Sequence, residues 1–162
     1  MIHIRKIKSE DTPKVKNLIQ NIMETEFSTA GKFYTMHDVE QPEKYYGGEK
    51  DTFLIAEENG EIVGTVAVKE DAPQTALLRR VFVHKDYRGK GYGKKLMNKA
   101  LEFCFQHNYQ NVVFRGVDKM QAALKLCLKN GFEEADVPLQ GDVKLTILTR
   151  NLKDAKQVHA AS

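Results

Sequence analysis

A basic, glycine-rich segment in the middle of the chain constrains the fold more than any other feature. It reads Val-Phe-Val-His-Lys-Asp-Tyr-Arg-Gly-Lys-Gly-Tyr-Gly-Lys-Lys-Leu over residues 81–96. β-Branched and aromatic residues favour a strand before it, and apolar residues at helical spacing favour a helix after it. The free amides at a helix N-terminus attract anions, and glycines let a ligand come close to the backbone. The segment therefore predicts a strand–loop–helix unit that binds phosphate or pyrophosphate.

Positive charge is concentrated in the same part of the chain. Eight Lys or Arg residues and one acidic residue, Asp86, lie between Arg79 and Lys99, giving +7 in a chain whose net charge is only +3. This concentration favours an anionic ligand, although a solvated basic helix face gives the same pattern. Two familiar phosphate loops do not fit. No window has the Walker spacing, and Lys94 stands where the dinucleotide-binding motif needs its third glycine.

The remaining pattern predicts an α/β (α+β) fold with a mixed sheet flanked by helices. The length of 162 residues suits one domain, which we expect over residues 1–152, with a disordered tail over 153–162. Asn59-Gly60 predicts a tight hairpin turn, and Asp118 is a candidate N-cap for the last helix. Residues 27–48 lack periodicity and predict a loop with a short helix. We expect strands over residues 2–7, 53–56, 62–68, 75–83, 112–117, 132–137 and 143–150, and helices over 13–23, 91–104 and 118–129.

The composition also bears on the cellular environment of the protein. No run of about 18 apolar residues is present, and the first residues lack the apolar region of a signal peptide. The two cysteines, Cys104 and Cys127, lie in apolar stretches, which favours a reducing compartment. The five histidines show no metal-ligand spacing, so no metal is expected. We expect a soluble, cytoplasmic protein.

The loop has the pattern Arg-x-x-Gly-x-Gly at Arg88, Gly91 and Gly93. This pattern resembles the acetyl-CoA pyrophosphate loop of the GNAT acetyltransferase superfamily. The similarity runs over about residues 2–150 and includes the Asn-Gly hairpin, the strand Leu-Arg-Arg-Val-Phe-Val that ends at residue 83, and Lys-Asn-Gly-Phe at residues 129–132. The resemblance implies a central mixed, mostly antiparallel sheet of about seven strands, flanked by about four helices.

The resemblance also implies a function and a set of site residues. It implies direct transfer of the acetyl group of acetyl-CoA to a primary amine in a ternary complex, with the Val83 amide as oxyanion donor. The cofactor is expected where the strands of Leu77 and Val112 splay apart. The residues that it assigns to CoA are Val81, Phe82, Val83, Arg88, Gly89, Lys90, Gly91, Tyr92, Gly93 and Lys94.

Two positions depart from the family pattern. Leu77 stands where many members carry a glutamate base, and the sequence does not choose among Glu40, Glu57, Glu58 and Glu70 as substitutes acting through water. Cys127 stands where members usually carry a tyrosine that protonates the CoA thiolate. Cys127 could act as that acid, but a buried core thiol is the favoured interpretation.

The acceptor is left open as a small amine, an amino acid or a peptide amine. Members of the superfamily tend to line the acceptor pocket with the segment after the first helix, so Phe33, Tyr34 and Tyr45 are candidates. An alternative function is a non-catalytic acyl-CoA sensor, because both usual proton-handling positions are vacant. A nucleic-acid partner is not expected, since few aromatic residues alternate with the basic ones. No membrane partner is expected, and a homodimer is compatible with the sequence.

Overall fold

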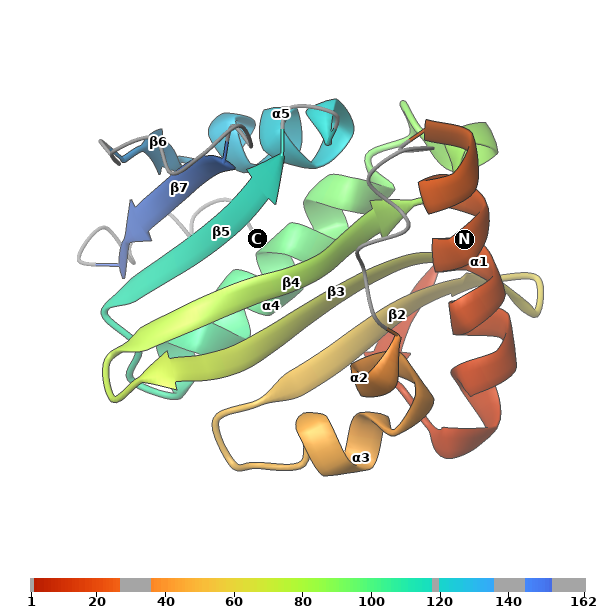
Figure 1. Cartoon of the computed structure of the whole chain (residues 1–162), viewed down its shortest axis with the longest axis horizontal. Coiled ribbons are helices and arrows are strands. Elements are labelled where there is room, and N and C mark those ends of the chain that lie inside the picture. The colour runs from red at the N-terminus through yellow and green to blue at the C-terminus, as the bar shows by residue number, and fades with distance from the viewer. Residues whose placement is uncertain (1, 27–35, 118–119, 136–144, 153–162) are drawn as a thin grey trace.

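The computed structural model of the chain describes residues 2–26, 36–117, 120–135 and 145–152. It contains one seven-stranded sheet in the order β1-β2-β3-β4-β5-β7-β6, and every neighbouring pair is antiparallel except β4 and β5 (Figure 1). The mixed, mostly antiparallel sheet of seven strands is therefore confirmed. The strands are β1 (His3–Lys6), β2 (Thr52–Glu58), β3 (Glu61–Ala72), β4 (Thr75–Val83), β5 (Asn111–Val117), β6 (Glu133–Glu134) and β7 (Leu145–Asn151).

Helices cover both faces of this sheet. One face carries α1, α2 and α3, and the other carries α4 (Figure 1). The last helix, α5, contacts α4, β5 and β7. The helices are α1 (Thr12–Glu26), α2 (His37–Glu40), α3 (Pro42–Tyr45), α4 (Tyr92–Gln106) and α5 (Gln121–Lys129), with short 3-10 turns at Ser9–Asp11 and Lys85–Tyr87.

The periodicity of the sequence accounts for how these layers pack. Apolar residues at helical spacing on α1 and α4 are buried against the sheet. All residues from Ile62 to Val68 on β3 are buried, because helices lie over both faces of this central strand. Asn59 and Gly60 have φ angles of 52° and 82°, as the predicted hairpin turn requires.

Some boundaries differ from the predicted ones. Strand β3 continues to Ala72, four residues beyond the predicted end, because its antiparallel pairing with β4 continues to the hairpin turn. Met120 precedes α5 rather than lying within it, yet its side chain is buried. The predicted N-cap Asp118, the end of the predicted strand 132–137 and the tail 153–162 lie outside the described residues, in whole or in part.

A bulge interrupts the ladder between β3 and β4. Thr65 pairs with Phe82 and Ala67 pairs with Arg79, so Arg80 and Val81 both lie opposite a single residue of β3. Arg80 has a φ angle of 53°, which is uncommon for a residue with a side chain. The buried hydroxyl of Thr65 donates a hydrogen bond of 2.6 Å to the Arg80 carbonyl oxygen. This bond holds the backbone at the point where the regular ladder is broken.

The bulge follows the place where β4 leaves β5. These two strands pair in parallel only from Thr75 to Leu78 on β4 and from Asn111 to Phe114 on β5. Beyond Leu78, β4 continues to Val83 along β3, while β5 continues to Val117 along β7. The two strands thus diverge, as expected, and open one edge of β4 within the sheet.

Replacing Thr65 tests the importance of the bulge. Thr65→Val keeps the shape of the side chain but leaves the buried Arg80 carbonyl without this partner. We expect the free energy of unfolding to fall by about 1–3 kcal/mol, measured by urea denaturation. Thr65→Ser keeps the hydroxyl and is the control. An equal loss in both variants would show that the hydrogen bond is not the stabilising contact.

Candidate functional site

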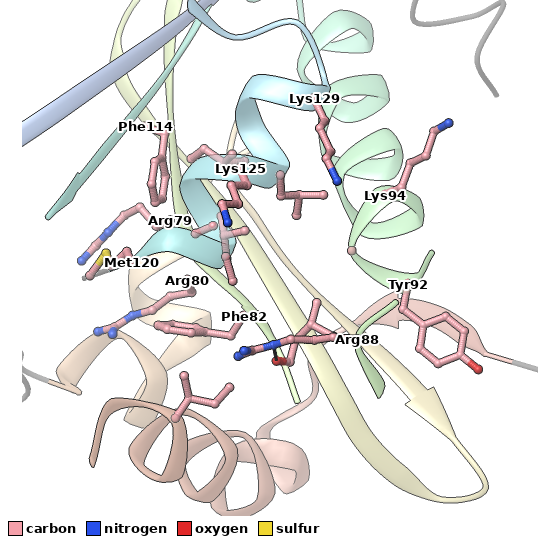
Figure 2. A pocket seen from close by; sticks show the side chains of 18 of the residues that line it. Arg79, Arg80, Phe82, Arg88, Tyr92, Lys94, Phe114, Met120, Lys125 and Lys129 are labelled. Atoms are coloured by element: carbon pink, nitrogen blue, oxygen red, sulfur yellow. Dashed lines mark hydrogen bonds between the residues drawn. The ribbon is translucent and has the colours of Figure 1, made fainter. Parts of the chain in front are cut away.

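A cavity of about 700 Å³ lies where β4 and β5 diverge. Its wall is formed by β4 from Leu77 to Val83, the loop after β4, the first turn of α4, the end of β5, and one side of α5, with Ile22 of α1. Arg79, Arg80, Phe114 and Met120 lie toward one end, whereas Arg88, Tyr92, Lys94 and Lys129 lie toward the other (Figure 2). The cavity therefore extends along the exposed edge of β4 from the loop toward the bulge.

The loop end of the cavity has the geometry of an anion site. Gly89 and Gly91 have φ angles of 80° and 82°, and Gly91 is the N-cap of α4. A Cβ at either glycine would have no other atom within 4 Å, so the space above the backbone is open. The first turn of α4 carries no acidic residue, and its amides have no acceptor within the helix. The predicted strand–loop–helix unit is therefore present, with open glycines before the N-terminus of α4.

Gly93 has a different role from the other two loop glycines. A Cβ there would lie 3.1 Å from a Leu126 methyl carbon and 3.5 Å from a Val83 methyl carbon. Its missing side chain therefore lets the start of α4 pack closely against α5 and β4. The sequence pattern alone does not separate this packing role from close approach to a ligand.

The Arg88 side chain joins three segments around the loop. Its Nε donates to the Val83 carbonyl oxygen at 2.9 Å, and its two terminal nitrogens donate to the Glu26 carboxylate at 2.6 and 2.8 Å. The hydrogen bond from Arg88 lowers the pKa of Glu26. Arg88 thus ties the end of α1 to the end of β4, while it also lines the cavity.

Two other residues predicted to bind the cofactor also make contacts outside the cavity. Lys90 does not line the cavity, and its Nζ lies 5.1 Å from the centre of the Tyr87 ring. Tyr92 lines the cavity and its hydroxyl donates to Glu58 at 2.8 Å. The Tyr87 and Tyr92 rings are stacked, with centroids 6.4 Å apart. These contacts order the loop through its side chains and leave its backbone free to face the cavity.

The edge of β4 presents amides to the cavity. The His84 N–H donates to Val63 O at 2.8 Å, and the next pair in the ladder is Gly64 with Val83. Pairs alternate in antiparallel ladders, so the Val83 N–H is directed away from β3. Val81 lies two residues earlier, within the bulge. Both residues line the cavity, so this edge of β4 faces the space between β4 and β5.

A buried ionic cluster supports the bulge end of the cavity. Arg80 donates to the two carboxylate oxygens of Asp38 at 2.6 and 3.0 Å, and the Tyr46 hydroxyl donates to the same carboxylate at 2.6 Å. All three residues are buried. Burial alone would raise the pKa of Asp38, but the hydrogen bond and charge of Arg80 lower it below its usual value. No motif in the sequence predicts this cluster, whose only local signal is the pair of arginines in an apolar strand.

The four glutamates considered as general bases lie outside the cavity lining. Leu77 lines the cavity, whereas each candidate glutamate is outside the lining and is paired with another side chain. Glu40 pairs with Lys16, Glu57 with Arg5, Glu58 with Tyr92, and Glu70 with Lys50. Among the described residues, the cavity lining includes no aspartate or glutamate.

Cys127 is placed in the core. Its side chain has no exposed surface, and it does not line the cavity, whereas its neighbours Ala123 and Leu126 do. Burial raises the pKa of its thiol to about 12. This placement favours a packing role over proton donation. A thiol with so high a pKa is a weak acid, and the Cys127 side chain does not reach the cavity.

The acceptor candidates are not brought to the cavity within the described residues. Phe33 and Tyr34 lie outside those residues. Tyr45 ends α3 and does not line the cavity, and its carbonyl oxygen accepts a hydrogen bond from Lys69 Nζ at 2.6 Å. The side chains that line the bulge end are instead Arg79, Phe114 and Met120, none of which the sequence analysis selected.

Comparison with known proteins decides the family. The model of the acetyltransferase (GNAT) family matches residues 17–132. The chain belongs to this family. Its structure is similar to that of a GNAT acetyltransferase from Staphylococcus aureus Mu50, with a TM-score of 0.83 and 26% identity over 94% of this chain and 99% of the other. PaiA N-acetyltransferase from Thermoplasma acidophilum, solved with coenzyme A, has the same fold, with a TM-score of 0.71 and 20% identity over 93% and 99% of the two chains.

The relatives in sequence are longer proteins. An N-acetylaspartate synthetase from Xenopus tropicalis is 36% identical over 104 residues, which are 63% of this chain and 37% of that protein. The alignments with this synthetase and with a probable N-acetyltransferase from the same organism cover less than half the length of either relative. In the described part of this GNAT chain, no helix has the length and apolar character needed to span a bilayer. In the same part, no three His, Cys, Asp or Glu side chains are grouped so that they could hold a metal ion.

The buried cluster gives a prediction about stability. Asp38→Asn removes the carboxylate charge that holds the buried Arg80 guanidinium, so we expect a loss of about 3–5 kcal/mol in the free energy of unfolding. Because the pKa of Asp38 is lowered by folding, the wild-type protein should lose stability as the pH falls below about 4. Part of that acid dependence should disappear in Asp38→Asn. Denaturation at several pH values measures both effects.

Glu40→Gln is the matched control for this variant. Glu40 lies on the same short helix and pairs with Lys16 at 2.8 Å, but both side chains are substantially exposed. We expect little change in stability from its replacement. A similarly small effect of Asp38→Asn would contradict the importance of the buried cluster.

The two cysteines give a prediction about reactivity. Burial raises the pKa of both Cys104 and Cys127 to about 12, so neither is a thiolate near neutral pH. We expect the folded protein at pH 8 to resist a thiol reagent such as Ellman's reagent, and both thiols to react after unfolding. Rapid reaction of one thiol that disappears in Cys127→Ala would show that Cys127 is accessible, contrary to its placement in the core.

Proposed function

We propose that this chain is an N-acetyltransferase that binds acetyl-CoA in the cavity between β4 and β5. The transfer to a primary amine is direct, in a ternary complex. The observation that carries the proposal is the pairing of an open glycine loop at the N-terminus of α4 with the unpaired edge of β4. A phosphate group fits the first feature, and an extended amide chain fits the second.

The residues present fit coenzyme A at both ends of its length. The amides of the loop from Gly89 to Lys94 hold the pyrophosphate, because the open glycines and the helix N-terminus accept an anion there. The edge of β4 at Val81 and Val83 holds the pantetheine arm as an added strand. Lys94 and Lys129 lie at the loop end and favour the phosphates.

The backbone of β4 also provides the electrophilic assistance. Acetyl-CoA supplies an activated thioester, on whose carbonyl oxygen negative charge develops during transfer. The Val83 N–H is the oxyanion donor assigned from the sequence, and it is directed away from β3 toward the cavity edge of β4. One such donor is worth about 3 kcal/mol of barrier.

Proton handling in this proposal relies on water and on the leaving group. A protonated amine must lose a proton before it attacks, and Leu77 provides no base. Water in the cavity carries that proton away. A thiol with a pKa of about 8.5 leaves near neutral pH without strong assistance from an acid. Neither step therefore requires Cys127.

A non-catalytic acyl-CoA sensor is the second candidate function. Its support is that Leu77 lines the cavity where the family often has a base, and that Cys127 lies in the core where the family often has an acid. Acetylated aspartate appears in the name of the related synthetase, which favours an enzyme with an amino-acid acceptor. Turnover separates the two candidates, because a sensor binds acetyl-CoA without releasing CoA.

The experiment is calorimetric titration with acetyl-CoA, followed by thiol release with a panel of amines. Gly91→Glu should abolish binding, because a carboxylate at the N-cap of α4 occupies the open space and repels phosphate. Gly60→Glu is a matched control, since Gly60 has the same φ angle of 82° and equally open space but lies in the β2–β3 hairpin. Equal acetyl-CoA affinity in wild type and Gly91→Glu would overturn the proposal.

A further inference from the structure

The charged side chains that line the cavity in the described residues are all cationic. Four of them lie around the loop or on α5, and those at the loop end favour the phosphates of bound CoA. Three others, on β4 and β5, line the cavity nearer the bulge, and Figure 2 shows two of them, Arg79 and Arg80, at the end opposite to Arg88 and Lys94. The phosphates do not account for this second group. The seven residues are Arg79, Arg80, Arg88, Lys94, Arg115, Lys125 and Lys129.

Near the bulge end, the described residues include three guanidinium groups and two carboxylates beside them. Arg80 forms two hydrogen bonds with Asp38 and is buried. Arg115 lies 3.5 Å from Asp71. Arg79 Nη1 lies 3.9 Å from the Asp38 carboxylate that Arg80 already holds, which is beyond hydrogen-bond distance. Among the described residues, three positive charges thus lie beside two negative charges, and Arg79 is the one without a carboxylate within hydrogen-bond distance, so we assign the surplus to it.

The Arg79 side chain, which carries this surplus charge, faces the cavity. Its side chain is 38% exposed and lines the cavity beside Leu77. The neighbouring Arg80 is fixed by Asp38, by Tyr46 through that carboxylate, and by the hydrogen bond from Thr65 to its carbonyl. The backbone that carries Arg79 is therefore held in place by its neighbour. The planar donor fork of an arginine suits a carboxylate, which can bind to it with two hydrogen bonds.

We propose that the acceptor is a small amine that carries a carboxylate, and that Arg79 binds this carboxylate at the bulge end of the cavity. This inference rests on the proposed function, because it places the acceptor beside the acetyl end of acetyl-CoA. One surplus positive charge matches one carboxylate. A polyamine or a lysine-rich peptide would instead bring positive charge against Arg79 and Arg115.

The test compares acceptors that differ only in charge. CoA release is measured with L-alanine against L-alaninamide, and with glycine against glycinamide, at fixed pH and saturating acetyl-CoA. We expect the acid of each pair to have the higher kcat/KM, by about tenfold or more, because the amide leaves the charged donor fork without its ionic partner. The amine of alaninamide loses its proton more readily than that of alanine, so intrinsic reactivity opposes the expected result in that pair.

Variants assign the preference to Arg79. Arg79→Ala should raise KM for the acids by about tenfold or more and change the amides little, so the preference for acids disappears. Arg79→Lys should restore part of it, because charge remains without the planar fork. Lys69→Ala is the matched control. Lys69 is also 38% exposed and pairs with a buried aspartate, Asp51, but it does not line the cavity.

The outcomes separate this inference from the proposed function. Binding of acetyl-CoA with equal or faster turnover of the amides would overturn the carboxylate assignment and leave the acetyl-CoA site intact. Binding without turnover of any acid in the panel would also overturn it and would favour the sensor. An acid preference that persists in Arg79→Ala would overturn the role of Arg79. Failure to bind acetyl-CoA at all would overturn the proposed function, and this inference with it.

Discussion

The divergence of β4 from β5 after Leu78 is the constraint on which the rest of this structure depends. A parallel pair that continued to Val83 would satisfy the β4 edge with backbone hydrogen bonds and leave no space beside it. The bulge at Arg80 and Val81 bends the strand where the pairing ends, and Thr65 holds the Arg80 carbonyl there. The cavity and the free amides of β4 both follow from this local break in the ladder.

Positive charge in the cavity arises in two physically different ways. At the loop, partial charges of the α4 amides combine with basic side chains, which suits phosphates. At the bulge, a buried Arg80–Asp38 pair is held by Tyr46, and it lies beside Arg79. Two cationic regions of different origin thus lie at opposite ends of one cavity.

The backbone carries most of the chemistry in the proposed mechanism. Leu77 and Cys127 leave the positions of a base and an acid without a suitable side chain, and the glutamates considered as substitutes are paired outside the cavity lining. Backbone amides on a fixed strand donate hydrogen bonds without first having to gain or lose a proton. Acetyl transfer between a thioester and an amine is compatible with such a site, because the thiolate is a good leaving group.

The local elements could be predicted from the sequence, since helical and strand periodicity, the Asn59-Gly60 turn and the glycine loop are encoded by neighbouring residues. The same residues indicated the family and the phosphate end of the site. Three features could be seen only in the folded chain: Gly93 serves packing, Cys127 lies in the core, and Asp38 meets Arg80 across 42 positions of chain. Contacts between distant segments depend on how strands pair and diverge, and no local pattern of residues records that.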